Sequence, residues 1–368
     1  MKIERIELHV VSIPLKHFFE TSFGRVEREV HIIVKMYGEG LVGYGESAVM
    51  TDPSYSYETI ETVWHIQKDF LIPALLHKDI EDIESFMRMV STVRGHHFAK
   101  CGLEGAYWHL CALQKGEPLY KMWNGTRKTI QSGVSVGIQN SIDDLLSRIK
   151  QFLDEGYKRI KIKIKPGWDV DVVRAVRKQF GNIPLMVDAN AAYTPDDISV
   201  FEALDEYHLM MIEQPLHFAD LTDHAELQKK LKTPICLDES ISGLRTAKAA
   251  LALGSCRVIN IKPGRVGGYY QAKKIHDLCH GANIPVWCGG MLEFGIGRAF
   301  NVSLCSLPNF LFPGDVSSSS RYFHEDIISP PIEFSHGELT IPDEPGFGFQ
   351  PDDNLIKKYS QRSYIAPE

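Results

Sequence analysis

Residues 159–165 read Arg-Ile-Lys-Ile-Lys-Ile-Lys, a run with β-strand alternation, and a Pro-Gly turn and a helical segment at 170–180 follow it. Short β-type runs recur along the chain, and segments with helical spacing of apolar residues separate them. The predicted strands are 133–138, 160–164, 185–188, 210–213, 235–238, 258–262, 285–289 and 310–312. Alternating strands and helices are typical of a parallel sheet, and eight such units predict a closed (β/α)8 barrel of the α/β class.

A doubly wound open sheet is the alternative for such a pattern. Its phosphate-binding motif, G-x-G-x-x-G, follows none of the predicted strands. The alternation also places Lys161, Lys163 and Lys165 on one face of their strand, as in a solvated edge strand. The units on both sides instead place this strand inside the barrel, where its lysines require partners. The barrel is therefore the favoured fold.

The first third of the chain has a different pattern. Predicted strands at 6–10, 30–36 and 41–48 indicate an antiparallel meander, with a polar and aromatic loop at 16–29 and helices over 57–125. Beyond Ser329 no further strand–helix unit follows. We predict an α+β domain at 1–125, the barrel at 126–325, and a C-terminal segment, 326–368, that returns to the N-terminal domain.

Composition excludes several classes of protein. The 368 residues are 44% hydrophobic and 24% charged, which is typical of a globular protein with a real core. The net charge is -7 and no Lys/Arg block is present, so nucleic acid is not an expected partner. No apolar run approaches the roughly 18 residues of a membrane helix, and no signal-peptide core is evident. The seven cysteines are scattered without a C-x-x-C pair, so we expect free thiols and a cytoplasmic location.

Five ionisable residues lie near the ends of successive predicted strands. They are Lys163, Asp188, Glu213, Asp238 and Lys262, and the steps between them are 25, 25, 25 and 24 residues, one strand–helix unit each. In a parallel barrel, residues repeated at the unit period lie at the same height on adjacent strands. We therefore predict that all five meet at the carboxyl-terminal mouth, where barrel active sites form.

The three carboxylates predict a metal site. Asp188, Glu213 and Asp238 on neighbouring strands would repel one another unless a cation lay among them. Oxygen ligands without histidine or cysteine select a hard ion, Mg2+ or Mn2+, over zinc. Three such ligands leave room for water and for a substrate carboxylate.

The two lysines predict base chemistry. Lys163 on the second strand and Lys262 on the sixth lie on opposite sides of the barrel, with the acids between them. A divalent cation and a second ammonium would depress the pKa of either lysine from about 10.4 towards the working pH. The favoured reaction is removal of a proton α to a carboxylate, with the metal holding the resulting enediolate.

These residues resemble the enolase superfamily, in its muconate-lactonizing-enzyme-like branch. The resemblance rests on Lys161-Ile-Lys163, Asp188-Ala-Asn190, Glu213-Gln-Pro215, Asp238-Glu-Ser240 and Asn260-Ile-Lys262, in this order and spacing. The stretches 165–169, 260–268, 287–291 and 312–315 are similar to the o-succinylbenzoate synthase and N-succinylamino acid racemase group. The resemblance implies that the N-terminal domain and the C-terminal segment cap the barrel, and that the chain forms a dimer or an assembly of dimers.

The resemblance also implies roles for individual residues. Asp188, Glu213 and Asp238 would bind Mg2+, with Glu239 and Asn190 in support. Lys163 would take the α-proton of a small carboxylate substrate, and Lys262 would stabilise the intermediate or act as the second acid/base. The implied substrate-binding residues are Ser135, Lys161, Arg265, Gly289, Gly290, Met291, Asp315, Phe19 and Phe23. The loop at 16–29, with Phe19 and Phe23, would cover the barrel mouth and exclude water.

Several alternatives remain open at this stage. N-acylamino acid racemisation could be the sole role, or another cycloisomerase or epimerase reaction could replace it. A lysine Schiff-base aldolase and a non-catalytic barrel are further alternatives. Arg265 could be a surface arginine at a helix start, and the loop at 16–29 could be packed permanently. A dipeptide epimerase is disfavoured, because Asp315-Val-Ser317 lacks the second acid of an Asp-x-Asp.

Overall fold

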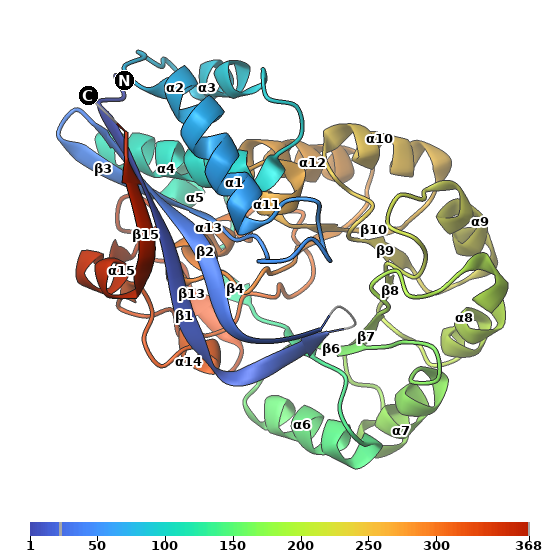
Figure 1. Ribbon diagram of the computed structural model, residues 1–368. Helices are drawn as coiled ribbons and strands as arrows, with labels where there is room; N and C mark the ends of the chain where they lie inside the picture. Colours follow the sequence, from blue (N-terminus) through green and yellow to red (C-terminus); the bar gives the residue numbers. More distant parts are fainter. Residues whose placement is uncertain (22–23, 367–368) are drawn as a thin grey trace.

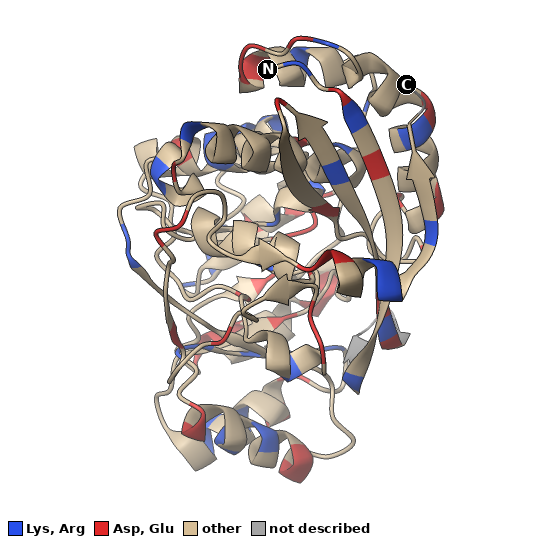
Figure 2. Ribbon diagram, turned by 90° about the vertical axis from the view of Figure 1, so that its left-hand side faces the viewer, with Lys and Arg blue, Asp and Glu red and all other residues tan. Residues whose placement is uncertain are grey.

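The computed structural model describes residues 1–21 and 24–366. It contains a curved parallel sheet surrounded by helices and a separate antiparallel sheet that carries both ends of the chain (Figure 1). Acidic and basic residues are interspersed over the outer helices and the antiparallel sheet (Figure 2). Within the described part of the chain, no helix combines the length and apolar character that crossing a bilayer requires.

Seven of the eight predicted barrel strands form the parallel sheet, in the order β11-β10-β9-β8-β7-β6-β5. Their bounds are β5 Val134–Val136, β6 Ile160–Lys163, β7 Leu185–Asp188, β8 Ile212–Glu213, β9 Ile235–Leu237, β10 Val258–Ile261 and β11 Val286–Cys288. The eighth predicted strand, 310–312, is not a continuous strand. Phe310 pairs with Val286, and Gly314 pairs with Ser132, through single parallel bridges. This segment thus connects the two edges of the sheet.

Helices cover the outside of the parallel sheet (Figure 1). They are α6 Ile142–Asp154, α7 Val170–Phe180, α8 Ile198–Asp205, α9 Thr222–Lys230, α10 Leu244–Leu253, α12 Tyr269–Gly281 and α13 Gly295–Leu304. Two short helices of the same region, α11 Pro263–Val266 and α14 Ser319–Tyr322, contact the cap instead. Helix α6 shows which sequence features allow these helices to be predicted. The Ser141 side chain caps its first turn by accepting from Asp144 N, and Leu145, Ile149 and Phe152 form its buried face.

The barrel interior is layered. Side chains at Met186, Met211, Cys236, Val258 and Trp287 pack together as an apolar floor. Side chains alternate along a strand, so the residue two positions further on faces the same interior, one layer higher. Those next residues include Asp188, Glu213 and Asp238, which places the acids above a dry floor.

The strand register corrects one expectation. Lys163, Asp188 and Glu213 pair in sequence across β6, β7 and β8, so they share one row. Glu213 then pairs with Cys236, not with Asp238, which lies two residues further along its strand. Closing a barrel requires tilted strands and a staggered register. The five residues therefore lie at staggered positions of the register and do not share one row.

The cap contains the antiparallel sheet β15-β1-β2-β3 and a group of helices. Its elements are β1 Arg5–Thr21, β2 Gly24–Gly38, β3 Leu41–Ser47, α1 Ile60–Ile66, a π-helical turn η1 Gln67–Leu71, α2 Ile72–Leu75, α3 Ile83–Val90, α4 His97–Lys115 and α5 Leu119–Met122. Helix α4 packs tightly on β3. A Cβ at Gly43 would lie 2.1 Å from Ala106 O, so this contact requires glycine.

The segment 16–29 is not a loop. Most of it continues β1 and β2 as a long hairpin arm, in which Phe19 pairs with Val26 after a register shift that begins at Pro14. The strand pairing satisfies backbone groups that a loop would leave to water. The arm reaches the mouth of the barrel, because Val26 and Glu29 line the same pocket as Lys163. The prediction of a cover is consistent with this position, but a mobile lid stays a prediction.

The C-terminal end returns to the cap, as predicted. Strand β15, Ser360–Ile365, pairs antiparallel with β1 and follows helix α15, Asp353–Tyr359. Two small sheets join the tail to itself and to the barrel: β12 Ile328–Ser329 with β14 Gln350–Pro351, and β13 Glu338–Thr340 with β4 Thr129–Gln131. The division at residues 125 and 325 stays a prediction.

Candidate active site

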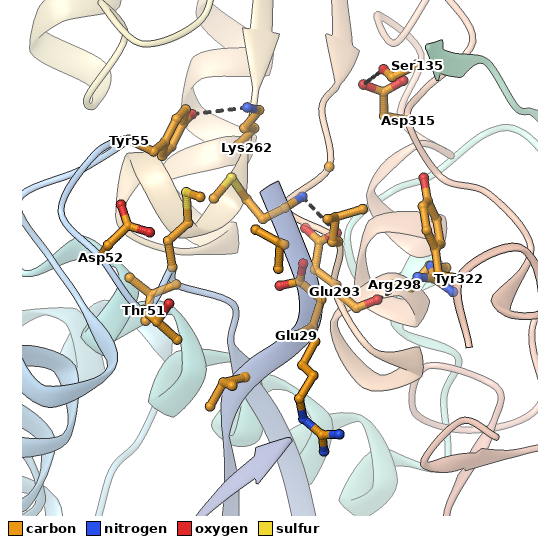
Figure 3. Close-up of a pocket in the computed structure, with 18 of the residues that line it drawn as sticks. Glu29, Thr51, Asp52, Tyr55, Ser135, Lys262, Glu293, Arg298, Asp315 and Tyr322 are labelled. Carbon is orange, nitrogen blue, oxygen red and sulfur yellow. Dashed lines mark hydrogen bonds between the residues drawn. The ribbon is translucent and has the colours of Figure 1, made fainter. Parts of the chain in front are cut away.

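A pocket lies between the strand ends of the barrel and the cap (Figure 3). The barrel contributes Ser135, Lys161, Lys163, Asn190, Lys262 and Asp315. The cap contributes residues of the hairpin arm, including Arg28 and Glu29, and of the segment 49–55, including Asp52 and Tyr55. Of the residues predicted to bind substrate, Ser135, Lys161, Gly290, Met291 and Asp315 line this pocket.

Two lysines of β6 contact the acids of neighbouring strands. Lys161 Nζ lies 3.3 Å from Asp188 Oδ2 and 3.1 Å from Glu213 Oε2, so a single cation already reaches both carboxylates. Lys163 Nζ donates to Asp188 Oδ2 and to Asn190 Oδ1, both at 2.6 Å. Both lysines are buried, yet both line the pocket.

Asp238 lies in a separate group of contacts. Lys262 Nζ is 2.8 Å from Asp238 Oδ2, and Arg265 forms a second ion pair with the same carboxylate. The Tyr55 hydroxyl, from the cap, donates to Asp238 Oδ1 at 3.3 Å. It accepts from Lys262 Nζ at 3.1 Å (Figure 3). Arg265 is buried and donates to Ile241 O, so the alternative of a surface arginine is wrong.

The lysines Lys163 and Lys262 approach the pocket from different strands. Lys163 ends β6, and Lys262 directly follows β10, with β7, β8 and β9 between them in the sheet. Both side chains reach one pocket, and neither points outward. This arrangement supports the expectation of two amino groups that approach a substrate from different sides.

The electrostatics of the acids are uneven. Burial and the charge of Asp188 raise the pKa of Glu213 to about 7. Burial and the same neighbouring charge raise the pKa of Glu239. Burial also disfavours the charged form of Asp188. The neighbouring Lys163 and Lys161 outweigh the effect of burial, so the pKa of Asp188 is lowered. Burial and a neighbouring carboxylate therefore favour the protonated forms of Glu213 and Glu239, whereas the two lysines favour the ionised form of Asp188.

The donor set fits a divalent cation, although the ligands are not gathered. No three histidine, cysteine, aspartate or glutamate side chains are arranged to hold a metal ion within residues 1–21 and 24–366. Glu239 Oε2 is buried and accepts no hydrogen bond, whereas Asp238 Oδ2 is buried with the Lys262 ammonium 2.8 Å away. A buried carboxylate oxygen without a donor favours a hard cation. The structure thus supplies carboxylates suitable for binding a divalent cation, and lysine and arginine side chains form ion pairs with these carboxylates.

Asn190 and Glu239 contact each other and the lysine. Asn190 Nδ2 donates to Glu239 Oε1 at 3.0 Å, while Asn190 Oδ1 accepts from Lys163. Asn190 also has a positive φ of 44°, a conformation that needs support from its surroundings. These contacts agree with the supporting role that the sequence resemblance implies.

Asp315 is held by cations of the barrel itself. Arg159, which is fully buried, donates to Asp315 Oδ1 at 2.5 Å, and Lys161 Nζ lies 3.0 Å from Oδ2. Ser135 Oγ donates to the same oxygen at 3.0 Å (Figure 3). Asp315 therefore orients Lys161 and Ser135 at the pocket wall, and direct contact with substrate stays a prediction.

The remaining predicted substrate-binding residues have different positions. Gly289 does not line the pocket, and a Cβ there would lie 2.8 Å from Lys262 Cε, so this glycine leaves space for the lysine. Arg265 does not line the pocket and forms an ion pair with Asp238. Phe19 lies in β1, where only its backbone is described, and Phe23 lies outside the described residues.

The cap residues of the pocket were missed by sequence reasoning. Tyr55 and Asp52 lie between a strand and a helix, where no periodic pattern marks them, and Glu29 lies in a segment interpreted as a loop. A tyrosine 207 residues from Lys262 gives no local signal of its contact. Only the packing of the cap on the barrel brings these side chains to the site.

Glu29 belongs to a buried network that joins the arm to the barrel. His31 lies between two carboxylates, with Nδ1 2.7 Å from Glu46 Oε1 and Nε2 3.5 Å from Glu29 Oε2. Glu46 in turn accepts from Phe294 N and Gly297 N at the start of α13. The network thus connects the pocket wall on the arm with the loop after β11.

We expect His31 to make folding stability pH-dependent. Burial opposes its charge, but Glu29 and Glu46 outweigh this and raise its pKa from 6.5 to about 9. Because the pKa of His31 is higher in the folded state, its protonation contributes to the free energy of unfolding. This contribution is complete below pH 6.5 and is lost as the pH rises through 9. Urea unfolding across this range should show a decline of about 3 kcal/mol, from about 1.4 kcal/mol per pKa unit. The decline should be absent from His31→Gln; an equal decline there would assign it to other groups.

Two family models match the chain. Residues 5–123 match the mandelate racemase/muconate lactonizing enzyme N-terminal domain, and residues 144–355 match the enolase C-terminal domain-like model. The chain is 49% identical to an o-succinylbenzoate synthase of Geobacillus kaustophilus, over 98% of this chain and 96% of that protein. It is 44% identical to an N-succinylamino acid racemase of Thermus thermophilus, over 95% and 94%.

A solved structure gives the same result for the fold. A member of the enolase superfamily from Listeria innocua superposes with a TM-score of 0.97 at 40% identity, covering 100% of this chain and 99% of that one. The match includes both the cap and the barrel. The likeness therefore extends over the two regions that together form the pocket.

Proposed function

Because the chain belongs to the mandelate racemase/muconate lactonizing enzyme family of the enolase superfamily, we propose that it is a Mg2+-dependent o-succinylbenzoate synthase of the cytoplasm. The reaction is dehydration of 2-succinyl-6-hydroxy-2,4-cyclohexadiene-1-carboxylate. Enzymes of this family generally depend on a divalent metal, and relatives 44–49% identical to this chain are named o-succinylbenzoate synthase. The observation that carries the proposal is the pair Lys163 and Lys262, both buried and both facing one pocket.

Lys163 is the proposed base. Its Nζ, held by Asp188 and Asn190, would accept the proton α to the ring carboxylate. The same ammonium would then return a proton to the departing hydroxyl group, so that water leaves and the ring becomes aromatic. Lys262, on the other side, would stabilise the negative charge that develops on the substrate. Mg2+ held by Asp188, Glu213 and Asp238 would further stabilise this charge on the carboxylate oxygens.

The charge balance of the site supports an anionic substrate. Five acids lie in contact or interaction with five bases; the acids are Asp188, Glu213, Asp238, Glu239 and Asp315, and the bases are Lys161, Lys163, Lys262, Arg159 and Arg265. With Lys163 unprotonated, as a base must be, the group carries a charge of -1, and a divalent cation would bring it to +1. The substrate of the synthase and N-succinylamino acids each carry a carboxylate beside the α-proton. That carboxylate would restore neutrality in a largely dry site.

Racemisation of N-succinylamino acids is the second proposed activity. Inversion needs a proton donor on each face of the α-carbon, and Lys163 and Lys262, which line one pocket, would supply one each. A relative of this chain is named N-succinylamino acid racemase, which agrees with this proposal.

Both activities can be tested together in D2O. The protein with Mg2+ is offered the dehydration substrate and a panel of N-succinylamino acids, and product formation and α-deuterium uptake are followed. We expect dehydration, and deuterium in both enantiomers of the amino acids. In Lys262→Ala, racemisation should cease while exchange continues in one enantiomer, because Lys163 still serves one face. Exchange of both enantiomers in this variant, or the absence of dehydration in the parent, would contradict the corresponding assignment.

A further inference from the structure

Gln214 lies where three strand ends meet. It directly follows Glu213 at the end of β8, is fully buried, and adopts a positive φ of 37°. This conformation is strained for a residue other than glycine and persists only where surrounding contacts hold it. Its neighbours at the next strand end, Asn190 and Ala191, also have positive φ.

The hydrogen-bonding groups of the Gln214 side chain all bind the segments that follow β8 and β9. Oε1 accepts from Asp238 N at 3.0 Å and from Ser240 N at 3.2 Å. Nε2 donates to Ser240 Oγ at 2.7 Å and to Leu216 O at 3.1 Å. A glutamine is suited to this site because it offers an acceptor for two amides and two donors for oxygens.

The Gln214 backbone extends the connection to the other neighbour. Gln214 N donates to Cys236 O, and Gln214 O accepts from Ala191 N, both at 2.8 Å. One residue thus bonds to the segments that follow β7 and β9 as well as to its own turn. Asp188 and Glu213 directly precede the segments after β7 and β8, and Asp238 begins the segment after β9.

We propose that Gln214 is a positioning residue that fixes the main chain of Asp238 relative to Glu213, so that their carboxylates can bind one divalent cation. This inference rests on the proposed metal-dependent function. The Asp238 side chain faces Lys262 and Arg265 in this structure, so its carboxylate must turn to join the other acids. Gln214 would hold the main-chain amide of Asp238 in place while the Asp238 side chain turns.

Gln228, in α9, is a matched control because it binds the start of β9, the strand whose end Gln214 binds. Gln228 is also buried, with 3% of its surface exposed, and its Oε1 accepts from Ile235 N at 2.7 Å. Its Nε2 donates to Thr233 O at 3.2 Å and Leu231 O at 3.4 Å. Gln228 therefore holds the start of β9 by the same kind of bonds with which Gln214 holds its end. Loss of either should destabilise the fold, but only Gln214 contacts a proposed ligand.

The test compares Gln214→Leu with Gln228→Leu, using Mn2+ as the probe. Affinity is measured by electron paramagnetic resonance titration, and stability by thermal unfolding without metal. We expect similar losses of stability, with Mn2+ affinity about 10-fold weaker in Gln214→Leu alone. Gln214→Glu, which keeps an oxygen for both amides, should stay within about 3-fold of the parent. If the leucine variant does not fold, Gln214→Met, which is closer in shape to glutamine, carries the same comparison.

Equal Mn2+ affinity in the Gln214 and Gln228 leucine variants would overturn the inference, since the amide would then be structural only. Equal weakening in Gln214→Leu and Gln214→Glu would also overturn it, because the shared oxygen would not matter. Failure of the parent protein to bind Mn2+ would instead remove the proposed function, and the inference with it. These outcomes separate an error in the inference from an error in the function.

Discussion

Lys163→Ala is expected to abolish dehydration, with a loss of at least about 10³-fold in kcat, because positioned acid–base groups contribute factors of about 10² to 10⁴. Lys163 would serve twice, as acceptor of the α-proton and as donor to the leaving hydroxyl. Lys163 is buried and lines the pocket, and its amine donates to Asp188 and Asn190. No other base on its strand occupies the same position, since Lys161 is tied to Glu213 and Asp315. Steady-state rates with the synthase substrate measure the effect.

Lys165→Ala is the matched control for this experiment. Lys165 is the next lysine of the alternating run, but it lies beyond the end of β6 and is exposed. Its removal should leave kcat within about 2-fold of the parent, as surface substitutions away from a site generally do. Full turnover in Lys163→Ala would show that the base is misassigned. A large loss in both variants would indicate a general effect of positive charge near the mouth.

Removal of the divalent cation is expected to abolish dehydration and racemisation, and Mg2+ should restore both. The physical reason is that the negative charge formed on loss of the α-proton needs compensation beyond that of the lysines. Since lysines and arginines already neutralise the acids, the metal-free protein should stay folded. Circular dichroism should be unchanged by EDTA, and Mg2+ at about 100 times its Kd should add about 2.7 kcal/mol to the free energy of unfolding.

A Schiff-base mechanism makes the opposite prediction. Such an enzyme would keep its activity in EDTA, and borohydride with a carbonyl substrate would attach that substrate covalently to a lysine. A non-catalytic barrel would show no measurable property that depends on metal. Full activity after exhaustive metal removal would therefore contradict the proposed mechanism. A borohydride adduct would in addition favour the aldolase alternative.

Local repetition made much of the molecule predictable. The strict alternation at 159–165 predicted β6, and both of its buried lysines line the pocket. Helix α7 coincides with the predicted segment 170–180, because capping and apolar spacing are local properties. The hairpin arm was mispredicted at 16–29 because its aromatic and polar residues do not alternate cleanly. Its strand character comes from pairing between β1 and β2.

The identity and order of the lysines and acids were set by the sequence alone, since strand alternation and the repeat of one strand–helix unit are written into the residues themselves. Tertiary structure decided how they meet. The staggered register places Asp238 two residues beyond the partner of Glu213, a consequence of strand tilt that no local pattern records. Tertiary structure also brings Tyr55 to Lys262 and pairs the buried Arg265 with Asp238. Such contacts join segments far apart in the chain, and only packing of the cap on the barrel brings them together.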